Sequence, residues 1–321
     1  VRRRPLPVPM TTTSMAAEGT APVRERRSRP PGSRLRTSQR RAGIAFALPV
    51  IVLELLLLAV PIAQAAYFSF TRWDGITASW IGPANYQRLF SDPTFWRVIA
   101  NNLLLLASVP FAIFIPLLVA YLLNEHVPGW RFFRSAYFLP TAISWVVIGM
   151  VALRVWANEG LLNHVLSAFG LGFIHTDMLA GELSAMEAVA ITFIWSVFGT
   201  NTIIFITGMA TLDRDVYEAA RVDGAGAFTT FVTITIPMLM GFIQFAFILT
   251  LITAFTALFS LIFVMTGGGP GYGTTTLEFY VYQQGFQVGV FGYAAAIGIV
   301  LFAIVFAISL AQLRIFRSRL D

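Results

Sequence analysis

Two kinds of side chain in this sequence could do chemistry inside long apolar segments: a lone carboxylate and a group of uncharged hydrogen-bonding residues. Glu54 lies within the apolar run 50–56, where an ionised carboxylate costs about 2.5–3.5 kcal/mol if the run crosses a bilayer. It could relay an ion or contact a moving neighbour; alternatively, it is protonated or hydrogen-bonded between helices. Proton-coupled transport needs a chain of such groups, and no second acidic residue lies deep in another apolar run. We therefore favour the structural interpretation of Glu54.

The uncharged group combines amides, hydroxyls and an indole ring. Its members within apolar segments are Asn101, Asn102, Trp195, Ser196, Thr200, Asn201, Gln244, Thr250, Thr253 and Thr256. A sugar presents hydroxyls to amide and hydroxyl groups and apolar C–H faces to an indole, whereas an ionic substrate would require charges that these segments lack. Packing between helices is the alternative for any single member. We select Trp195, Thr200, Asn201 and Thr253 as candidate residues of a substrate pathway.

Composition excludes several other chemistries. The chain has no cysteine, which excludes disulfides, thiolate catalysis and cysteine-ligated metal centres. All 22 basic residues are arginine, which excludes Schiff-base chemistry and the phosphate-binding lysine of a Walker A loop. His126, His164 and His175 lie in different loops, and no pair has metal-ligand spacing. We predict no catalytic residue and no metal site in this chain.

These side chains must be positioned by helices that cross a membrane. Of the 321 residues 57% are hydrophobic and 12% charged, whereas a soluble domain has about 25% charged residues. Crossing a bilayer takes about 20 apolar residues in a helix. The stretches that qualify are Ile44–Phe70, Val98–Leu123, Ala136–Trp156, Ala188–Thr211, Met238–Thr266 and Val290–Leu313. We expect an all-α, polytopic bundle of six transmembrane helices, in which Pro110, Pro116 and Pro140 bend helices and free carbonyl groups near any passage.

The placement of arginine predicts the orientation. Residues 1–42 hold eleven Arg and two Glu, a net charge of +9, and the rest of the chain carries −3. We interpret 1–42 as a disordered Arg-rich cytosolic tail lying against anionic headgroups, and 43–321 as the membrane domain. With the N-terminus inside, eighteen arginines lie on the cytosolic side, so both termini are expected in the cytosol.

The first apolar run has a rival interpretation as a signal peptide. Arg40 and Arg41 precede it, and the sequence Ala63-Gln64-Ala65 resembles a cleavage site. The run extends through Phe70, however, which is longer than the usual h-region of about 7–15 residues. We therefore favour an uncleaved helix.

The segment 213–237, between the fourth and fifth expected spans, carries the most information. Asp213 can cap a helix, Asp215 suits the helix dipole, and Gly224 can end that helix and let a second begin. The product is a helix–turn–helix at the membrane face, and its amphipathic first helix suits insertion into a groove of a partner. Its apolar side comprises Val216, Ala219 and Ala220, and its charged side Arg214, Glu218 and Arg221.

The same segment resembles the EAA signature of binding-protein-dependent ABC importer permeases, E-A-A-x-x-x-G-x9-I-x-[LI]-P. The matching residues are Glu218, Ala219, Ala220, Gly224, Ile234 and Pro237. Similarity to the sugar-permease branch extends over the stretches 80–86, 92–96, 138–140, 160–163 and 266–270, and the resemblance covers residues 43–321. One departure is Asp213, where the family often has proline; we expect it to alter the helix start and leave docking intact.

The resemblance implies a non-catalytic permease subunit for a sugar or oligosaccharide in the bacterial inner membrane. Its implied partners are a second homologous permease in a heterodimer, a dimer of ATPase subunits and an extracytoplasmic solute-binding protein. It implies no cofactor in this chain, since ATP and Mg²⁺ would bind the ATPase partner. The glycine-rich run 267–273 would be a flexible outer turn facing the binding protein. The implied ATPase-coupling residues are Glu218, Ala219, Ala220, Asp223, Gly224 and Pro237.

Three alternatives stay open. The same machinery could carry another solute, such as an amino acid or a polyol phosphate. A secondary transporter would use Glu54 as its only ion-coupling candidate, and the EAA resemblance would then be coincidental. A membrane-anchored scaffold would depend on its basic tail and would tolerate changes at Glu218.

Overall fold

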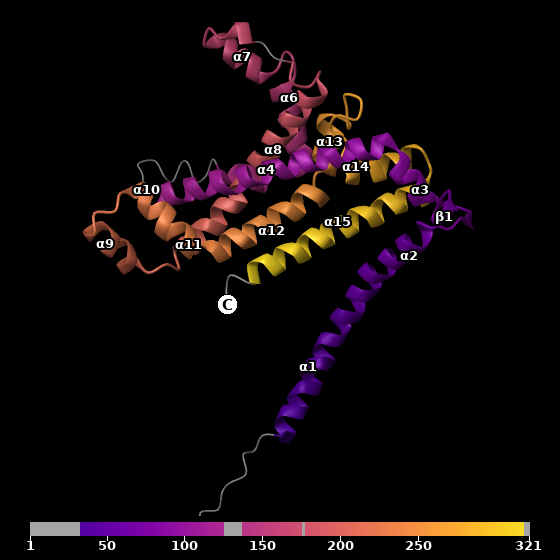
Figure 1. Ribbon diagram of the computed structural model, residues 1–321, viewed down its shortest axis with the longest axis horizontal. Helices are drawn as coiled ribbons and strands as arrows, with labels where there is room; N and C mark the ends of the chain where they lie inside the picture. Colours follow the sequence, from indigo (N-terminus) through magenta and orange to yellow (C-terminus); the bar gives the residue numbers. More distant parts are fainter. Residues whose placement is uncertain (1–32, 125–136, 175–176, 318–321) are drawn as a thin grey trace, which may run out of the picture. The chain divides into compact units, whose positions relative to one another are not determined.

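The computed structural model describes residues 33–124, 137–174 and 177–317, and most of these residues are helical (Figure 1). The chain forms two compact units, residues 1–57 and 58–321. In the first unit, α1 (Ser33–Glu54) leads into a π-helical turn, η1 (Leu55–Ala59). Residues 33–42, expected to be disordered, therefore belong to a helix, which their Arg, Leu, Gln and Ala residues favour. Glu54 ends α1 with an exposed side chain, and its role stays a prediction.

The second unit continues with α2 (Val60–Phe68) and an antiparallel hairpin that the sequence analysis did not predict. In this hairpin β1 (Thr71–Trp73) pairs with β2 (Ala78–Trp80), with Thr71 opposite Trp80. The turn is closed by the Asp74 carboxylate, whose Oδ1 accepts from the amides of Ile76 at 2.9 Å and Thr77 at 2.7 Å. Such Asx turns are a local device that apolar periodicity does not reveal.

The other elements of the second unit are helices and helical turns. They are α3 (Ala84–Ser91), α4 (Pro93–Asn124), η2 (Leu139–Ala142), α6 (Trp145–Trp156), α7 (Leu161–Ala168), η3 (Gly172–Ile174), α8 (Glu182–Met209), α9 (Arg214–Val222), α10 (Ala227–Thr230), η4 (Phe231–Thr235), α11 (Ile236–Met238), α12 (Met240–Thr256), α13 (Phe259–Met265), α14 (Leu277–Tyr282), η5 (Gln283–Gln287) and α15 (Phe291–Arg317).

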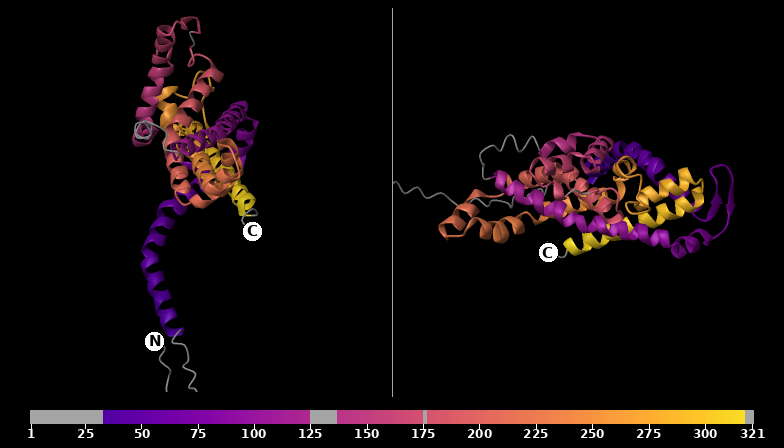
Figure 2. Two further views of the ribbon diagram at one scale, coloured as in Figure 1. Left: turned by 90° about the vertical axis from the view of Figure 1, so that its left-hand side faces the viewer. Right: turned by 90° about the horizontal axis from the view of Figure 1, so that it is seen from above.

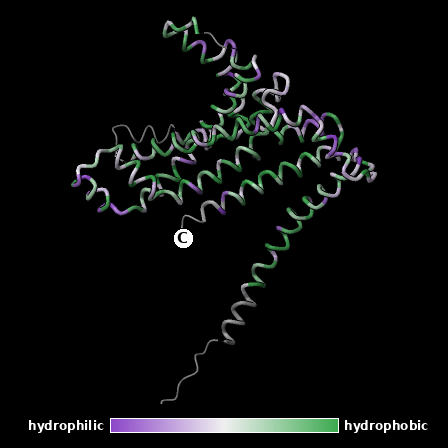
Figure 3. Tube along the Cα trace, in the orientation of Figure 1, coloured by the Kyte–Doolittle hydropathy of each residue, from purple (hydrophilic) through white to green (hydrophobic). Residues whose placement is uncertain are grey.

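The main core lies between α4 and α8, which pack along one another, and α12, which packs against both (Figure 2). Leu117, Phe193 and Phe205 are fully buried there. In Figure 3 hydrophobic residues run along α4, α8, α12 and α15, whereas hydrophilic residues gather on α9. This distribution is that of helices whose outer faces meet lipid and whose inner faces meet protein.

The expected membrane spans are confirmed as helices, but two of them are broken. Within the described residues, four helices are long and apolar enough to cross a membrane: Gly43–Phe68, Pro93–Leu123, Glu182–Met209 and Phe291–Gln312. Two bent pairs bring the number to six if each counts as one span. The predicted six-helix bundle is compatible with this arrangement.

Two interruptions of the expected spans lie beside prolines. The expected helix Ala136–Trp156 is interrupted between Phe138 and Trp145. Pro140 lies in a 3-10 turn there, and Ser144 is extended and caps α6, with Oγ accepting from the amide of Val147 at 3.4 Å. The chain bends by 73° between Ala227–Met238 and Met240–Thr256, next to Pro237, which has no N–H for the carbonyl of Thr233.

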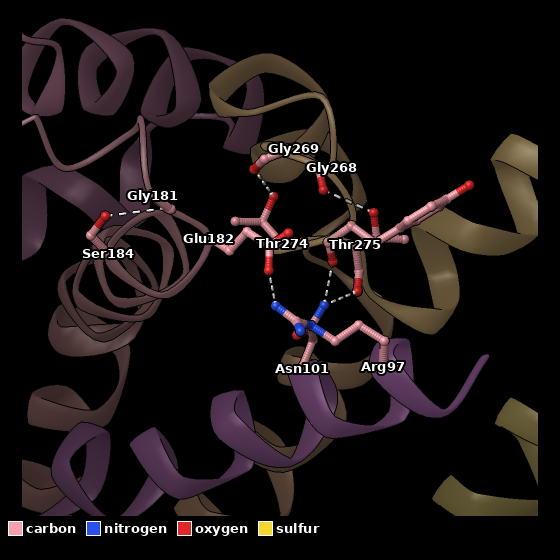
Figure 4. Close-up of polar contacts among 10 residues, drawn as sticks. Arg97, Asn101, Gly181, Glu182, Ser184, Gly268, Gly269, Thr274 and Thr275 are labelled. Carbon is pink, nitrogen blue, oxygen red and sulfur yellow. Dashed lines mark hydrogen bonds and ion pairs between the residues drawn. The ribbon is translucent and has the colours of Figure 1, made fainter. Parts of the chain in front are cut away.

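The loop 266–276 corrects another expectation, because it is tightly held and largely buried rather than a flexible turn. Asn101 Nδ2 on α4 donates to the carbonyl oxygens of Tyr272 at 2.7 Å and Thr275 at 2.9 Å (Figure 4). One residue further, Asn102 Oδ1 accepts from the amide of Leu277 at 2.9 Å. The side chains of Thr274, Thr275 and Thr276 are at most 2% exposed. Asn101 and Asn102 thus hold backbone, and neither lines the cavity described below.

An ion pair braces the same loop from the side. Arg97 on α4 pairs with Glu182 at the start of α8 (Figure 4). Glycine is required against Glu182, since a Cβ at Gly273 would lie 2.7 Å from the Cβ of Glu182. The loop, which connects α13 to α14, is therefore held against the beginnings of α4 and α8.

We expect Gly292→Ala to lower the free energy of unfolding by about 1–3 kcal/mol, because overpacking forces backbone apart. A Cβ at Gly292 would overlap the carbonyl oxygen of Thr71 and lie 3.0 Å from the amide nitrogen of Trp73. Gly298 in the same helix has no atom within 4 Å of such a Cβ, so Gly298→Ala is the matched control. Thermal unfolding of the detergent-solubilised protein compares the two, and equal melting temperatures would contradict the close packing of α15 on β1.

Candidate functional site

A cavity of about 260 Å³ lies within the bundle, between η2, α6, α8 and α12. Its lining residues are Pro140, Thr141, Ile143, Trp145, Ile148, Ser196, Val197, Thr200, Asn201, Leu249, Thr250 and Thr253. None of these described residues is ionisable. The cavity is slightly smaller than typical small-molecule pockets of about 300–1,000 Å³, and it combines apolar walls with a few convergent polar groups.

Three of the four selected pathway residues line this cavity: Thr200, Asn201 and Thr253. Trp195 does not; its side chain is 40% exposed on α8. The indole in the lining belongs instead to Trp145, which the sequence analysis did not select. Trp145 follows the cap residue Ser144. A tryptophan at the start of a helix, beside a turn that contains proline, was the feature of the sequence that could have marked it as a cavity residue.

Asn201 owes its position to a proline in the neighbouring helix. Pro116 in α4 has no N–H, so the carbonyl of Ala112 lacks its usual partner four residues on. Asn201 Nδ2 donates to that carbonyl oxygen at 2.7 Å and lies 3.0 Å from Thr250 Oγ1. The prediction that a proline frees a carbonyl near the passage is confirmed at this position. Asn201 is 1% exposed and is therefore chiefly a strut between α4, α8 and α12.

The hydroxyl groups of the cavity are more available than the amide of Asn201. Thr253 Oγ1 donates to the carbonyl oxygen of Leu249 at 2.8 Å, and Ser196 Oγ donates to that of Thr192 at 2.7 Å. Each hydroxyl oxygen keeps acceptor capacity after this bond. For Thr200 no side-chain hydrogen bond is recorded within the described residues. The wall can therefore exchange hydrogen bonds with a neutral polar molecule.

Gln244, another member of the uncharged group, lies outside this lining. Its side chain is buried on α12, and Nε2 has no partner within the described residues. Within the same part of the chain no group of three or more His, Asp and Glu residues could hold a metal ion.

At the end of the bundle where α4 and α8 finish, α9 has the caps expected from its sequence. Asp213 Oδ1 accepts from the amide of Asp215 at 3.0 Å. Gly224, at φ +78°, ends the helix in a Schellman motif: its amide donates to Arg221 O at 3.1 Å, and the next amide, of Ala225, donates to Ala220 O at 2.9 Å. The predicted helix–turn–helix is confirmed, with α10 beginning at Ala227.

The two faces of α9 differ from the expected division. Ala220 is buried and Tyr217 half-buried against the same chain, and Tyr217 Oη lies 3.2 Å from Thr235 Oγ1. Glu218 and Ala219 are exposed, as are Asp223, Gly224 and Pro237. Val222 and Phe228, 88% and 80% exposed, extend the apolar part of this surface. Of the three EAA residues, two therefore face outward and one anchors the helix.

These features define a class: a polytopic helical membrane protein with a neutral polar cavity in its bundle and an amphipathic hairpin at one end. Residues 89–320 match the family described as "Binding-protein-dependent transport system inner membrane component". The chain belongs to this family.

Named relatives agree with the family match. The multiple sugar-binding transport system permease protein MsmF of Streptococcus mutans is 33% identical over 276 residues, which cover 85% of this chain and 94% of the relative. The sulfoquinovosyl glycerol transport system permease protein SmoG of Agrobacterium fabrum is 34% identical over 84% of this chain and 89% of its own length. The fold matches a chain of a bacterial alginate ABC transporter, crystallised with an alginate pentasaccharide-bound periplasmic protein, with a TM-score of 0.75 and 24% identity over 87% of this chain and 96% of that chain.

The chain is thus a non-catalytic permease subunit of a binding-protein-dependent ABC importer in the membrane, and the ATPase activity resides in a partner. The family that the sequence resembled is confirmed. The roles of individual site residues stay predictions.

We expect Asn201→Leu to lower the free energy of unfolding by about 1–3 kcal/mol, because it leaves the Ala112 carbonyl without a donor in a buried environment. The neighbouring change Thr200→Val, also in the cavity wall, removes no recorded bond and should leave the melting temperature nearly unchanged. Thermal unfolding of both variants in detergent tests this difference. If the two variants melt together, Asn201 is not a strut.

Proposed function

We propose that this permease carries a sugar or oligosaccharide and forms half of a translocation pathway with a second homologous permease. The observation that carries the proposal is the uncharged cavity, in which the indole of Trp145 stands beside the hydroxyls of Thr200 and Thr253. The sugar substrates in the names of relatives such as MsmF support it. An anionic solute would leave its charge unpaired against this wall, which disfavours it.

The proposed topology places both termini in the cytosol. Residues 1–42, with eleven arginines, and the segments around α9 and after α15 would then lie on the inner side, as the positive-inside rule requires. The segments that would lie outside around α7 and between α13 and α15, residues 158–187 and 267–289, contain no arginine. The loop 266–276 would thus be on the side from which a solute-binding protein delivers substrate.

The proposed coupling element is the exposed surface of α9 and the turn that follows it. Val222 and Phe228 are large apolar side chains exposed beside Glu218, a combination that suits burial in a groove of a dimeric ATPase. ATP and Mg²⁺ would bind only that partner. Closure of the ATPase dimer would pull the coupling helices of the two permeases together, and the cavity would open alternately to each face.

A second cavity supports a mechanical role for α9. It measures about 190 Å³ and is lined by Tyr121, Leu122, Tyr217, Arg221, Ala225, Ala227 and Thr230. Tyr121 Oη donates to the carbonyl oxygen of Ala227 at 3.3 Å across it. Contacts between α4 and the α9–α10 hairpin would carry a displacement of α9 to the core.

We expect Thr253→Val to raise the KM of uptake about 2–10-fold, the loss of one hydrogen bond of about 0.5–1.5 kcal/mol. The matched control is Thr256→Val on the same helix, because Thr256 Oγ1 makes the same type of bond, to Ile252 O at 2.8 Å, and is exposed outside the cavity. Initial rates are measured with radiolabelled sugars in proteoliposomes that contain the full complex. An unchanged KM for Thr253→Val would move the substrate site elsewhere.

We expect Glu218→Lys and Gly224→Pro to insert normally and to lose ATP-driven uptake by at least about tenfold, because the first reverses a charge on the docking surface and the second cannot adopt a positive φ. Co-purification of the ATPase and its stimulation by loaded binding protein are the measurements. Glu159→Lys, an exposed change in the turn between α6 and α7, is the control and should behave as wild type.

Two results would contradict the coupling proposal. One is normal uptake together with normal co-purification in both variants. The other is modification of Val222→Cys, in this otherwise cysteine-free chain, by a membrane-impermeant thiol reagent added to whole cells.

A further inference from the structure

The span that contains α12 is interrupted before it ends. α12 finishes at Thr256 and α13 starts at Phe259, and between them Ala257 leaves helical geometry, at φ −124° and ψ 0°. The first amides of any helix lack intrahelical acceptors, and Leu258, the cap residue of α13, has no side-chain acceptor to offer. Leu258 is 1% exposed, so water does not supply one readily. The break needs an acceptor from elsewhere in the chain.

Glu278 on α14 supplies that acceptor. Its Oε2 accepts from the amide of Phe259 at 3.0 Å, nineteen residues earlier in the sequence. Burial raises the pKa of Glu278 to about 7, although hydrogen bonds from the amides of Phe259 and Leu258 act in the opposite direction. The carboxyl group therefore changes its charge near neutral pH.

Other ionisable groups around α14 do not account for this behaviour. Of the described residues on the elements packed against α14, those on α12, α13 and η5 include no Asp, Glu, Lys, Arg or His. Tyr280 on α14 and Tyr293 on α15 donate to Asp92, at 2.9 and 3.2 Å. The other ionisable residues on these elements are Tyr282 on α14, Arg97 and Tyr121 on α4, and Arg314 and Arg317 at the far end of α15. Arg97 pairs with Glu182. Burial and the two amides remain as the causes of the raised pKa.

The position of the break matters because the helix before it lines the cavity and the helix after it packs against α6, which also lines the cavity. α12 contributes Leu249, Thr250 and Thr253 to the wall. α13 packs mainly against α6, so closely that a Cβ at Gly149 would lie 3.1 Å from Val264 Cβ and 3.3 Å from the carbonyl oxygen of Leu261. α6 in turn contributes Trp145 and Ile148. A shift of α13 relative to α12 would therefore move one wall of the cavity against another.

We infer that Glu278 is a positioning residue for transport: its carboxylate fixes the break between α12 and α13, and loss of its charge lets α13 and the α6 wall shift. An ionised carboxylate is a stronger acceptor for the amide of Phe259 than the protonated group, one of whose oxygens becomes a donor. The inference rests on the proposed function, since the wall is that of the proposed sugar cavity and α14 would lie on the outer side. The pH outside the membrane would then set the geometry of the cavity.

The test uses the full complex in proteoliposomes with ATP and Mg²⁺ inside at a fixed internal pH. Sugar uptake is measured while the external pH varies from about 5.5 to about 8.5, a range that brackets the titration of Glu278. We expect the wild-type KM to change at least about 2-fold with a midpoint near 7, and Glu278→Gln to remove that component. Glu278→Asp, which keeps a titratable carboxyl group, should restore a pH dependence. Glu159→Gln, an exposed change on the same proposed side, should keep the wild-type profile.

A wild-type pH profile in Glu278→Gln would overturn the inference while leaving the proposed function intact. If no sugar is taken up by any variant, the proposed function fails, and a second measurement that needs only the chain in membranes decides on Glu278. Ser260→Cys in α13 reports local exposure through its rate of thiol labelling. We expect the ratio of labelling rates between the Ser260→Cys chain and the same chain with Glu278→Gln added to change as pH passes through about 7. A ratio that is constant with pH would overturn the inference. The inference would also fail if the Ser260→Cys chain and the same chain with Glu278→Asp added were labelled at identical rates, and neither rate depended on pH.

Discussion

The requirement that every buried backbone donor and acceptor find a partner governs this structure. Hydrocarbon offers none, so backbone groups that an interruption of a helix leaves open have to be paired within the protein, and at two interruptions a side chain from another helix does this. Pro116 leaves the Ala112 carbonyl open, and Asn201 closes it from α8. The gap after α12 leaves the Phe259 amide open, and Glu278 closes it from α14. Both repairs join segments distant in sequence, and Asn201 also lines the cavity.

The same principle organises the loop before α14. A segment rich in glycine and threonine would gain little from apolar burial, yet its threonines are buried because Asn101 and Asn102 hold the backbone from α4. Thr266 and Thr274 add a hydroxyl pair at 2.7 Å within the loop. The result is a rigid surface at the outer end of the proposed pathway, where a turn of this composition was expected to be mobile.

How much the sequence predicted depended on whether the signal was local. The apolar runs predicted the helices, and the caps of α9 at Asp213 and Gly224 were predicted residue by residue because capping is decided within a few positions. The breaks at Ser144 and Ala257 were missed, since apolar composition continues across them. Trp145, Glu278 and the roles of Asn101 and Asn102 depend on which helices become neighbours, and periodicity in one segment carries no information about that. Thr200 and Thr253 line the cavity, as neutral polar residues in apolar helices tend to face the interior of a bundle, and their role in transport stays a prediction.

The division of labour inside the cavity has an evolutionary corollary. Asn201 donates to a carbonyl of another helix, whereas within the described part of the chain Thr253 bonds only within its own helix and the Thr200 side chain makes no hydrogen bond. Under the proposed function, architecture and solute preference would therefore reside in different side chains of one wall. Substitutions at the two threonines could then accumulate without loss of the bond between Asn201 and the Ala112 carbonyl. Related permeases could in this way come to differ in substrate while they keep the same fold.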